Sequence, residues 1–262
     1  MTWAADFWNR VTSGFTRTEG LQAQPWLLAA VVAVAVLLSV PAGTWRWFGL
    51  YVTFVHELGH AFAALTAGHR ITGIELRFDH SGQMRSLGRS RFGVVWAGFW
   101  GYPVPALTGL ALIWAAQAGW ALAALSIGVL VLLAALLFIR NLQGAAIALG
   151  CAGAAVLLLW FVPAGLASLV IASLGIALLV GAVRDWLNVL SVHTRRRSAL
   201  QSSDAWILAQ RTKVPSGVWL LLFAVVIGAC AGAALWLLYS VSGLRTAVPL
   251  GSWCSQTGAV LS

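Results

Sequence analysis

Seven long stretches of almost uninterrupted apolar residues decide what kind of molecule this chain can form. Each is close to the ~20 residues that an α-helix needs to cross a lipid bilayer. Helices also satisfy all their backbone hydrogen bonds internally, as hydrocarbon requires. The expected spans are Trp26–Ala42, Phe48–Ala67, Phe92–Ala116, Trp120–Ile139, Ala145–Val162, Leu166–Val183 and Val218–Tyr239. The sequence therefore predicts an all-α polytopic membrane protein with about seven transmembrane helices.

Composition supports this class and leaves no room for a separate soluble domain. The chain has 262 residues, of which 60% are hydrophobic and 9% charged, and its mean hydropathy is +0.88. We expect an N-terminal cytoplasmic or interfacial segment (1–24), a single transmembrane domain (25–240) and a short external tail (241–262). In the first segment Trp3, Phe7 and Val11 recur at helical spacing, which predicts a short helix on the membrane surface. A disordered tail is the alternative.

The basic residues indicate an orientation rather than a nucleic-acid partner. If the N-terminus is cytoplasmic and the chain crosses seven times, 14 of the 16 Lys and Arg residues face the cytoplasm, which follows the positive-inside rule. Only Arg46 and Arg245 then lie outside. The net charge of +9 implies an anionic membrane surface as partner and no nucleic acid. We therefore expect a multi-pass protein of the cell (inner or plasma) membrane; the oligomeric state stays open.

A short polar motif interrupts the second apolar run. His56, Glu57 and His60 form a His-Glu-x-x-His pattern in a stretch with no other charge. Ionisable groups are costly in lipid and mark function there. On a helix, two histidines four residues apart leave the same face, which suits two ligands of one Zn²⁺ ion, with Glu57 placed to deprotonate a water. The alternative is a polar cluster that is hydrogen-bonded inside the bundle.

The residues after this helix change their period. Ile74–Asp79 alternates strictly between apolar and polar residues, and His80-Ser81-Gly82 supplies a turn. We interpret Ile71–Leu87 as a β-hairpin beside the motif, although a plain surface loop is the alternative. An unpaired strand edge near a protease site could bind an extended substrate by strand addition.

A catalytic zinc site needs a third protein ligand, and two aspartates compete for the role. Asp185 lies ten residues before the basic cluster that starts at Arg195, and His60 lies ten residues before Arg70, so both would sit at similar depth. Asp204 is the rival, although its context indicates the start of a short helix. We favour Asp185 as the third ligand. An ion pair between Asp185 and Arg184 is the alternative role for that carboxylate.

Two other features bear on the site. Glycines and prolines between Ala97 and Pro105 predict a broken helix beside the metal pocket, with ordinary packing irregularity as the alternative. The pair Arg140-Asn141 at the start of the fifth span is interpreted as an anchor at the membrane surface.

These motifs, in this order, resemble the site-2 protease clan of intramembrane zinc metalloproteases. The likeness is greatest to its bacterial and fungal site-2-protease-like branch, the peptidase M-fifty-B-like proteins. It extends over roughly Tyr51 to Trp219. It rests on the following motifs in order: His56–His60 with Ala61, the Gly73–Gly82 hairpin, Ala97-Gly98 to Pro103, Arg140-Asn141 with Gly144, Arg184-Asp185 and Ser203-Asp204-Ala205. The resemblance implies Zn²⁺ held by His56 and His60, Glu57 as catalytic base, and cleavage near the cytoplasmic face. Where site-2 proteases carry Leu-Asp-Gly for the third ligand, this chain has Arg184-Asp185-Trp186.

The sequence thus predicts a zinc-dependent intramembrane endopeptidase that cleaves a membrane-embedded protein substrate. Its predicted site consists of Glu57 as the catalytic residue and His56, His60 and Asp185 as metal ligands. An inactive metal-binding scaffold or regulator derived from the same family is the alternative. A small metal transporter is disfavoured, because an open site with an adjacent glutamate suits hydrolysis better than release of an ion.

Overall fold

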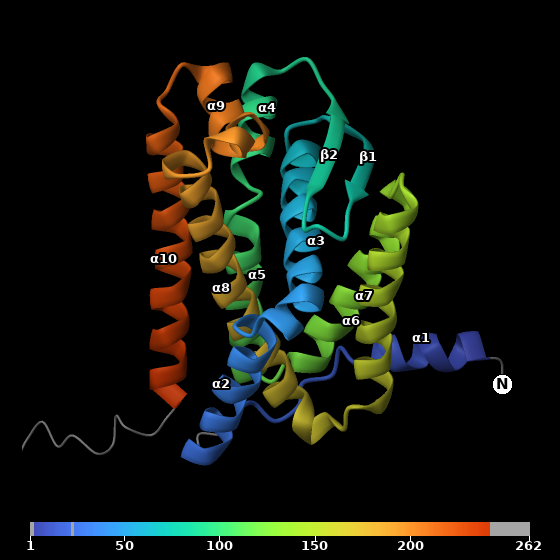
Figure 1. The fold of residues 1–262 in the computed structure, drawn as a ribbon. Coiled ribbons are helices and arrows are strands. Elements are labelled where there is room, and N and C mark those ends of the chain that lie inside the picture. The colour runs from blue at the N-terminus through green and yellow to red at the C-terminus, as the bar shows by residue number, and fades with distance from the viewer. Residues whose placement is uncertain (1–2, 22–23, 242–262) are drawn as a thin grey trace, which may run out of the picture.

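The computed structural model describes residues 3–21 and 24–241. The expected external tail (241–262) and Arg245 thus lie almost entirely outside the described residues. The described chain is a helical bundle with one two-stranded sheet (Figure 1). Its helices are α1 (Trp3–Ser13), α2 (Pro25–Ser39), α3 (Ala42–Thr66), α4 (Arg91–Phe99), α5 (Pro103–Gln117), α6 (Ala121–Ala135), α7 (Leu142–Phe161), α8 (Ala164–Thr194), α9 (Asp204–Thr212) and α10 (Ser216–Val241). The strands are β1 (Arg70–Leu76) and β2 (Gly82–Leu87), and 3₁₀ turns cover Leu136–Phe138 and Arg197–Ser202.

Four helices of the described chain are long and apolar enough to cross a membrane, namely α6 with its 3₁₀ extension, α7, α8 and α10. The bent pairs α2–α3 and α4–α5 raise the number to six if each pair forms one span. A multi-pass membrane protein is thus confirmed, whereas the expected count of seven spans is not. The break lies at Pro41, whose own backbone is extended (φ −65°, ψ 140°) and interrupts the helix, so that α2 and α3 meet there at 88°.

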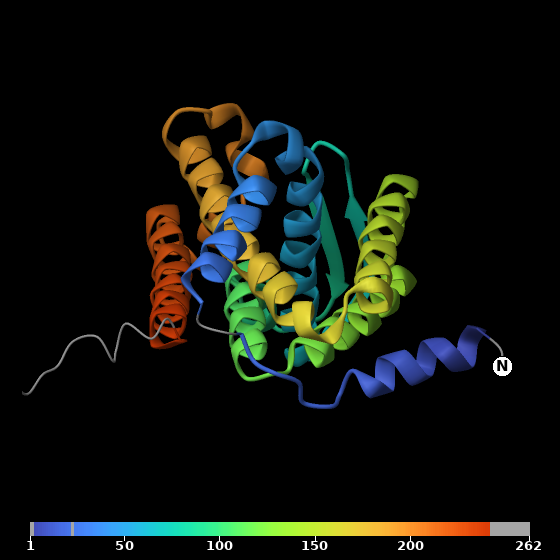
Figure 2. The same cartoon turned by 90° about the horizontal axis from the view of Figure 1, so that it is seen from below.

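The arrangement of the helices gives the molecule two distinct ends. The hairpin and α9 lie at one end, the hairpin end, and α1 lies at the other, the α1 end (Figure 1). Viewed from the α1 end, α1 runs across the direction of the bundle helices and projects to one side (Figure 2). The side chain of Arg10 donates to the carbonyls of Leu159 and Trp160 at 3.1 and 2.8 Å, which ties α1 to the end of α7.

This placement differs from the expected distribution of charge. Arg10 and Arg17 were expected on the same membrane face as the basic hairpin and the segment before α10. Instead they lie at the α1 end, where Arg17 donates to the carbonyl of Ala118 at 2.9 Å. The reason is that α2 and α3 form one bent pair, and the chain reaches the hairpin end at the end of α3.

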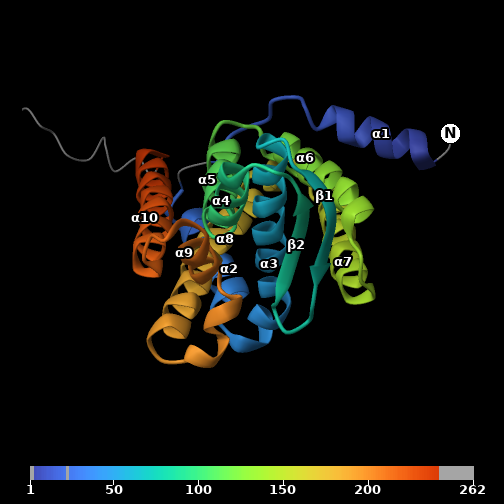
Figure 3. The same ribbon diagram turned by 90° about the horizontal axis from the view of Figure 1, so that it is seen from above.

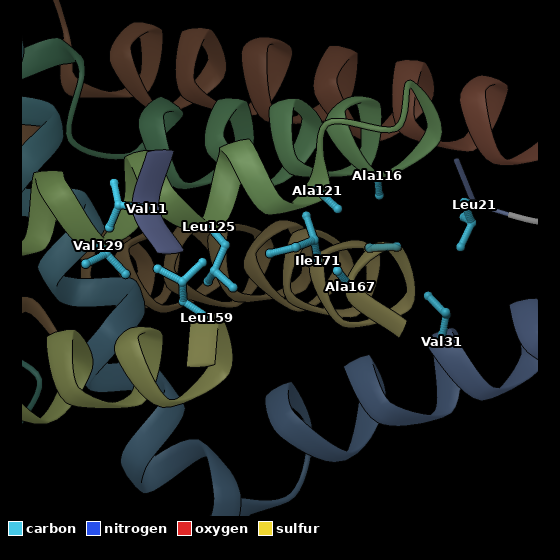
Figure 4. Packing of buried hydrophobic residues seen from close by; sticks show 11 residues of the cluster. Val11, Leu21, Val31, Ala116, Ala121, Leu125, Val129, Leu159, Ala167 and Ile171 are labelled. Carbon is cyan, nitrogen blue, oxygen red and sulfur yellow. The ribbon is translucent and has the colours of Figure 1, made fainter. Parts of the chain in front are cut away.

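The core at the α1 end explains how the N-terminal segment is held. Val11 is only 2% exposed and packs with Leu125, Val129 and Leu159, which come from α6 and α7 (Figure 4). Ile171 of α8 belongs to the same cluster. Burial of such side chains contributes roughly 1.5–3 kcal/mol each where they leave water. The predicted N-terminal helix is therefore present and is docked by one buried valine.

The predicted hairpin is confirmed as an antiparallel pair. Ile74 pairs with Met84, and both Ile74 and Leu76 are 1% exposed beneath the sheet. Seen from the hairpin end, β2 lies between β1 and α3 (Figure 3). The far edge of β1 is covered, because Ile139 forms a parallel bridge with Ile74.

Asn141 completes that cover. Its side-chain amide donates to the carbonyl of Leu76 at 2.6 Å and accepts from the Leu76 N–H at 3.1 Å. The amide thus imitates a strand partner, and Arg140-Asn141 does more than anchor a helix. The edge of the hairpin that remains for other contacts is β2, on the side of α3.

Candidate metal centre

Two imidazoles from one face of α3 form the base of the candidate site. His56 and His60 are four residues apart, so their side chains leave the helix one turn apart. Their Nε2 atoms lie 3.1 Å from each other. The Nδ1 atom of His60 is 2.7 Å from the carbonyl of Ala97 in α4. Because a carbonyl only accepts, Nδ1 carries the proton and Nε2 of the neutral ring has a free lone pair.

Asp204, the first residue of α9, brings a carboxylate to both rings. Its Oδ2 atom lies 3.2 Å from Nε2 of His56 and 3.3 Å from Nε2 of His60. The helix cap is Ser203, whose hydroxyl accepts from the N–H of Trp206 at 3.2 Å. Asp204 is therefore not needed as a cap, and its carboxylate can point toward α3.

The charge around Asp204 agrees with a site for a cation. Burial by itself would raise the pKa of the Asp204 carboxyl, but His60 and His56, when they carry an extra proton, and their hydrogen bonds hold it well below its usual range. The carboxylate form is thus favoured at neutral pH, which is the form that binds a metal.

The three ligand atoms have the geometry of one face of a tetrahedron. Their separations of 3.1, 3.2 and 3.3 Å form a nearly equilateral triangle. Four ligands at the ~2.0–2.1 Å typical of zinc stand about 3.3–3.4 Å apart in a tetrahedron. Among the described residues, His56, His60 and Asp204 are also the group of side chains that could hold a metal ion. The donor set and the spacing both fit Zn²⁺.

The structure brings Asp204, and not the expected Asp185, into contact with the two histidines. Asp185 is not part of this group and makes no ion pair with either histidine within the described chain. Asp204 takes its place because the chain after α8 turns back and brings the start of α9 over α3. The depth of a residue along its helix, which favoured Asp185, does not take into account this turn of the chain after α8. The alternative pairing of Asp185 with Arg184 is not seen either, since Arg184 donates to the carbonyls of Ser39 and Val40 at 2.8 and 2.9 Å.

Glu57 points from α3 toward the hairpin. It is 4% exposed, and its carboxylate takes part in a hydrogen bond with the backbone of Met84 in β2. Its Oε2 atom has no hydrogen-bond partner among the described residues. A Cβ added to Gly82 would collide with the carboxylate, so the glycine lets β2 approach closely. One carboxylate oxygen therefore remains available beside the two histidines.

The break between α4 and α5 covers the site and confirms the predicted bent helix. The two helices meet at 56°. A Cβ on Gly101 would lie 2.6 Å from Nε2 of His56 and would also overlap the ring of His60. A Cβ on Gly59 would lie 2.6 Å from the carbonyl of Trp100. Two glycines on opposite sides of this contact thus create the space in front of the ligand atoms.

The remaining histidines and one tyrosine complete the surroundings. Neither His69 nor His80 belongs to the metal-capable group among the described residues, as expected. Tyr102, which sequence reasoning missed, sets its ring against His56 with centroids 4.6 Å apart at 89°. Its position directly after Gly101 and before Pro103, in the predicted break, was the signal that could have identified it.

Comparison with known protein families shows to which family the chain belongs. The model of the family described as peptidase M50B-like matches residues 27–234. The chain belongs to this family. The matched region contains the histidine motif, the hairpin, the α4–α5 break and Asp204. No curated protein and no solved structure matches the chain.

Proposed function

We propose that this protein is a zinc-dependent intramembrane endopeptidase that cleaves membrane-spanning proteins. The observation that carries the proposal is the triangle of His56, His60 and Asp204 with the free carboxylate oxygen of Glu57 beside it. Membership in a peptidase family supports the same reaction class. Both histidines also lie on α3, which is part of the candidate span α2–α3, as suits a protease for membrane-spanning substrates.

The metal ion and the residues of the chain would contribute different parts of the chemistry. Zinc would be held by His56, His60 and Asp204, and when bound it polarises a carbonyl and makes water more acidic. Glu57 accepts the proton of the attacking water and delivers it to the nitrogen of the leaving amine. Its shielded position between α3 and β2 keeps other proton donors away. The hydrogen bond from His60 to Ala97 fixes the ring so that its Nε2 atom faces the site.

The free edge of β2 is the proposed binding surface for the scissile segment. The outer edge of β1 is covered by Ile139 and Asn141, whereas β2 faces α3 and Glu57. A substrate strand that pairs with β2 would place its backbone next to the catalytic carboxylate. Recognition by strand addition relies on main-chain hydrogen bonds, so it suits a substrate whose helix unwinds near the membrane surface.

The charge distribution supports an orientation for the site. Arg70, Arg85, Arg89, Arg91 and Lys213 all belong to the hairpin end. The positive-inside rule therefore favours a cytoplasmic hairpin end, with cleavage close to that face. The α1 end, with Arg10 and Arg17, then faces the opposite side. We propose this orientation in place of the cytoplasmic N-terminus that the sequence predicts.

The test compares wild-type protein with Glu57→Gln in membranes that contain a single-span reporter protein tagged at both ends. We expect wild-type protein to cut the reporter and Glu57→Gln to cut it at least 100-fold more slowly, while both retain zinc. Glu75→Gln is the matched control. Glu75 lies in the hairpin, where its carboxylate is 3.1 Å from the side chain of Arg85, and it is not one of the residues of the proposed site. Equal cleavage by Glu57→Gln contradicts the proposal. Zinc without cleavage in wild-type protein favours a scaffold role instead.

A further inference from the structure

Asp185 is a carboxylate inside the bundle that the proposed site leaves without a role. It forms no ion pair or hydrogen bond with another residue of the described chain. Its neighbour Arg184 is engaged at the α2–α3 break and lies over the ring of Trp45 at 4.2 Å. Asp185 is half-buried, and a half-buried carboxylate without a partner in the protein is expected to bind water or another group.

The register of two helices places Asp185 beside the metal centre. In Figure 1, α3 and α8 run in the same direction. They approach closely at Gly181, where an added Cβ would lie 2.8 Å from Val52. One turn further along each helix are Asp185 and His56, so these two side chains lie on the facing sides at the same level.

Two further polar groups converge on the same place. The hydrogen bond and ion pair of His56 both use Nε2, so Nδ1 has no partner among the described residues. The hydroxyl of Tyr102 also has no hydrogen bond within the described chain, and Asp185, Asp204 and Glu57 act on it electrostatically. Tyr102 and Asp185 both retain some exposed surface. No hydrogen bond joins these polar groups directly within the described chain, so a small molecule between them could bridge them.

We propose that Asp185 is a positioning residue for His56 and holds it through a bridging water that Tyr102 also binds. This inference rests on the proposed zinc site. A water that accepts a hydrogen bond from the Nδ1–H of His56, donates one to Asp185 and bonds the hydroxyl of Tyr102 satisfies all three groups. The ring is then locked with its Nε2 lone pair toward the metal, in the way that Ala97 locks His60. His60 thus has a direct outer partner and His56 a water-mediated one.

The test measures the zinc affinity of the purified full chain by competition with a chelator. Loss of an outer partner of a metal-binding histidine typically weakens metal binding by about 10–100-fold. We expect that loss for Asp185→Asn. We expect a smaller loss, of about threefold to tenfold, for Tyr102→Phe, which keeps the ring contacts with His56 and Phe223. Glu75→Gln removes a carboxylate elsewhere and should bind zinc like wild-type protein.

A spectroscopic measurement separates positioning from general stability. With Co²⁺ in place of zinc, Asp185→Asn should change the visible absorption bands of the ion, whereas Glu75→Gln should not. If Asp185→Asn and Tyr102→Phe both have the zinc affinity and the Co²⁺ bands of wild-type protein, this inference is overturned. The proposed function is not affected by that result. If wild-type protein binds no zinc under the same conditions, the proposed function fails as well.

Discussion

At the scale of single residues, the site depends on three atoms that a tetrahedral ion can contact together. The side chains of His56, His60 and Asp204 supply them, and Gly101 keeps the space in front of them open. The two histidines are adjacent on a helix, so the sequence motif was sufficient to predict their geometry. Asp204 comes from a separate helix, and only the folded chain shows that its carboxylate reaches them.

Gly101 provides a test at this scale. In Gly101→Ala the new methyl group would occupy the space beside Nε2 of both histidines, so we expect zinc affinity to fall by more than about tenfold while the helical content is unchanged. Gly43→Ala is the matched control, because an added Cβ there meets nothing within 4 Å. Chelator competition on both purified variants measures the effect. Wild-type affinity in Gly101→Ala would argue against this position of the metal.

At the scale of elements, the hairpin is set against α3 by contacts at its tip as well as at Glu57. His80 has a positive φ of 66° and stacks on Trp45, with ring centroids 6.1 Å apart. The hydroxyl of Thr53 donates to the carbonyl of His80 at 3.4 Å. Gly49 leaves room for this ring, because a Cβ there would lie 2.6 Å from its Nδ1 atom. The tip therefore fixes the strand that carries the proposed substrate edge.

Gly49→Ala tests this link between the tip and the strand. The methyl group would displace His80, and we expect backbone amides of β2 to exchange with deuterium about tenfold faster in detergent or nanodiscs. Gly43→Ala, one turn or more away on the same helix, should leave the exchange unchanged. If β2 exchanges at the same rate in Gly49→Ala, the hairpin is held by its other contacts alone.

The same scale shows what sequence patterns could and could not predict. The hairpin was predictable because alternation and a turn are local signals, and the broken span was predictable from its glycines and prolines. The cover of β1 by Asn141 depends on a contact between residues 65 positions apart in sequence, and no local pattern records it. For the same reason the choice between Asp185 and Asp204 could not be made from spacing.

At the scale of the whole molecule, the two ends carry different functions. The hairpin end holds the proposed site and the basic segments, and the α1 end holds a packed core that docks Val11. The apolar runs were sufficient to predict a multi-pass protein. The number of spans was not, because it depends on whether α2 and α3 form one passage or two.

Labelling of single cysteines tests this topology. In a background in which Cys151, Cys230 and Cys254 are replaced by alanine, Ser13→Cys lies at the α1 end and Arg89→Cys at the hairpin end. We expect a membrane-impermeant maleimide to label position 13 from outside intact cells and position 89 only after the membrane is opened. Labelling of both positions from the same side would contradict the arrangement of α2 and α3 as one passage.

The zinc content of the purified protein tests the central claim most directly. Elemental analysis of wild-type protein should find about one zinc per chain, and Asp204→Ala should retain almost none, because two neutral imidazoles alone bind the ion weakly. Asp185→Ala, analysed in parallel, should still contain zinc when the metal is supplied in excess. A wild-type protein without zinc, or an Asp204→Ala variant with a full complement, would contradict the account.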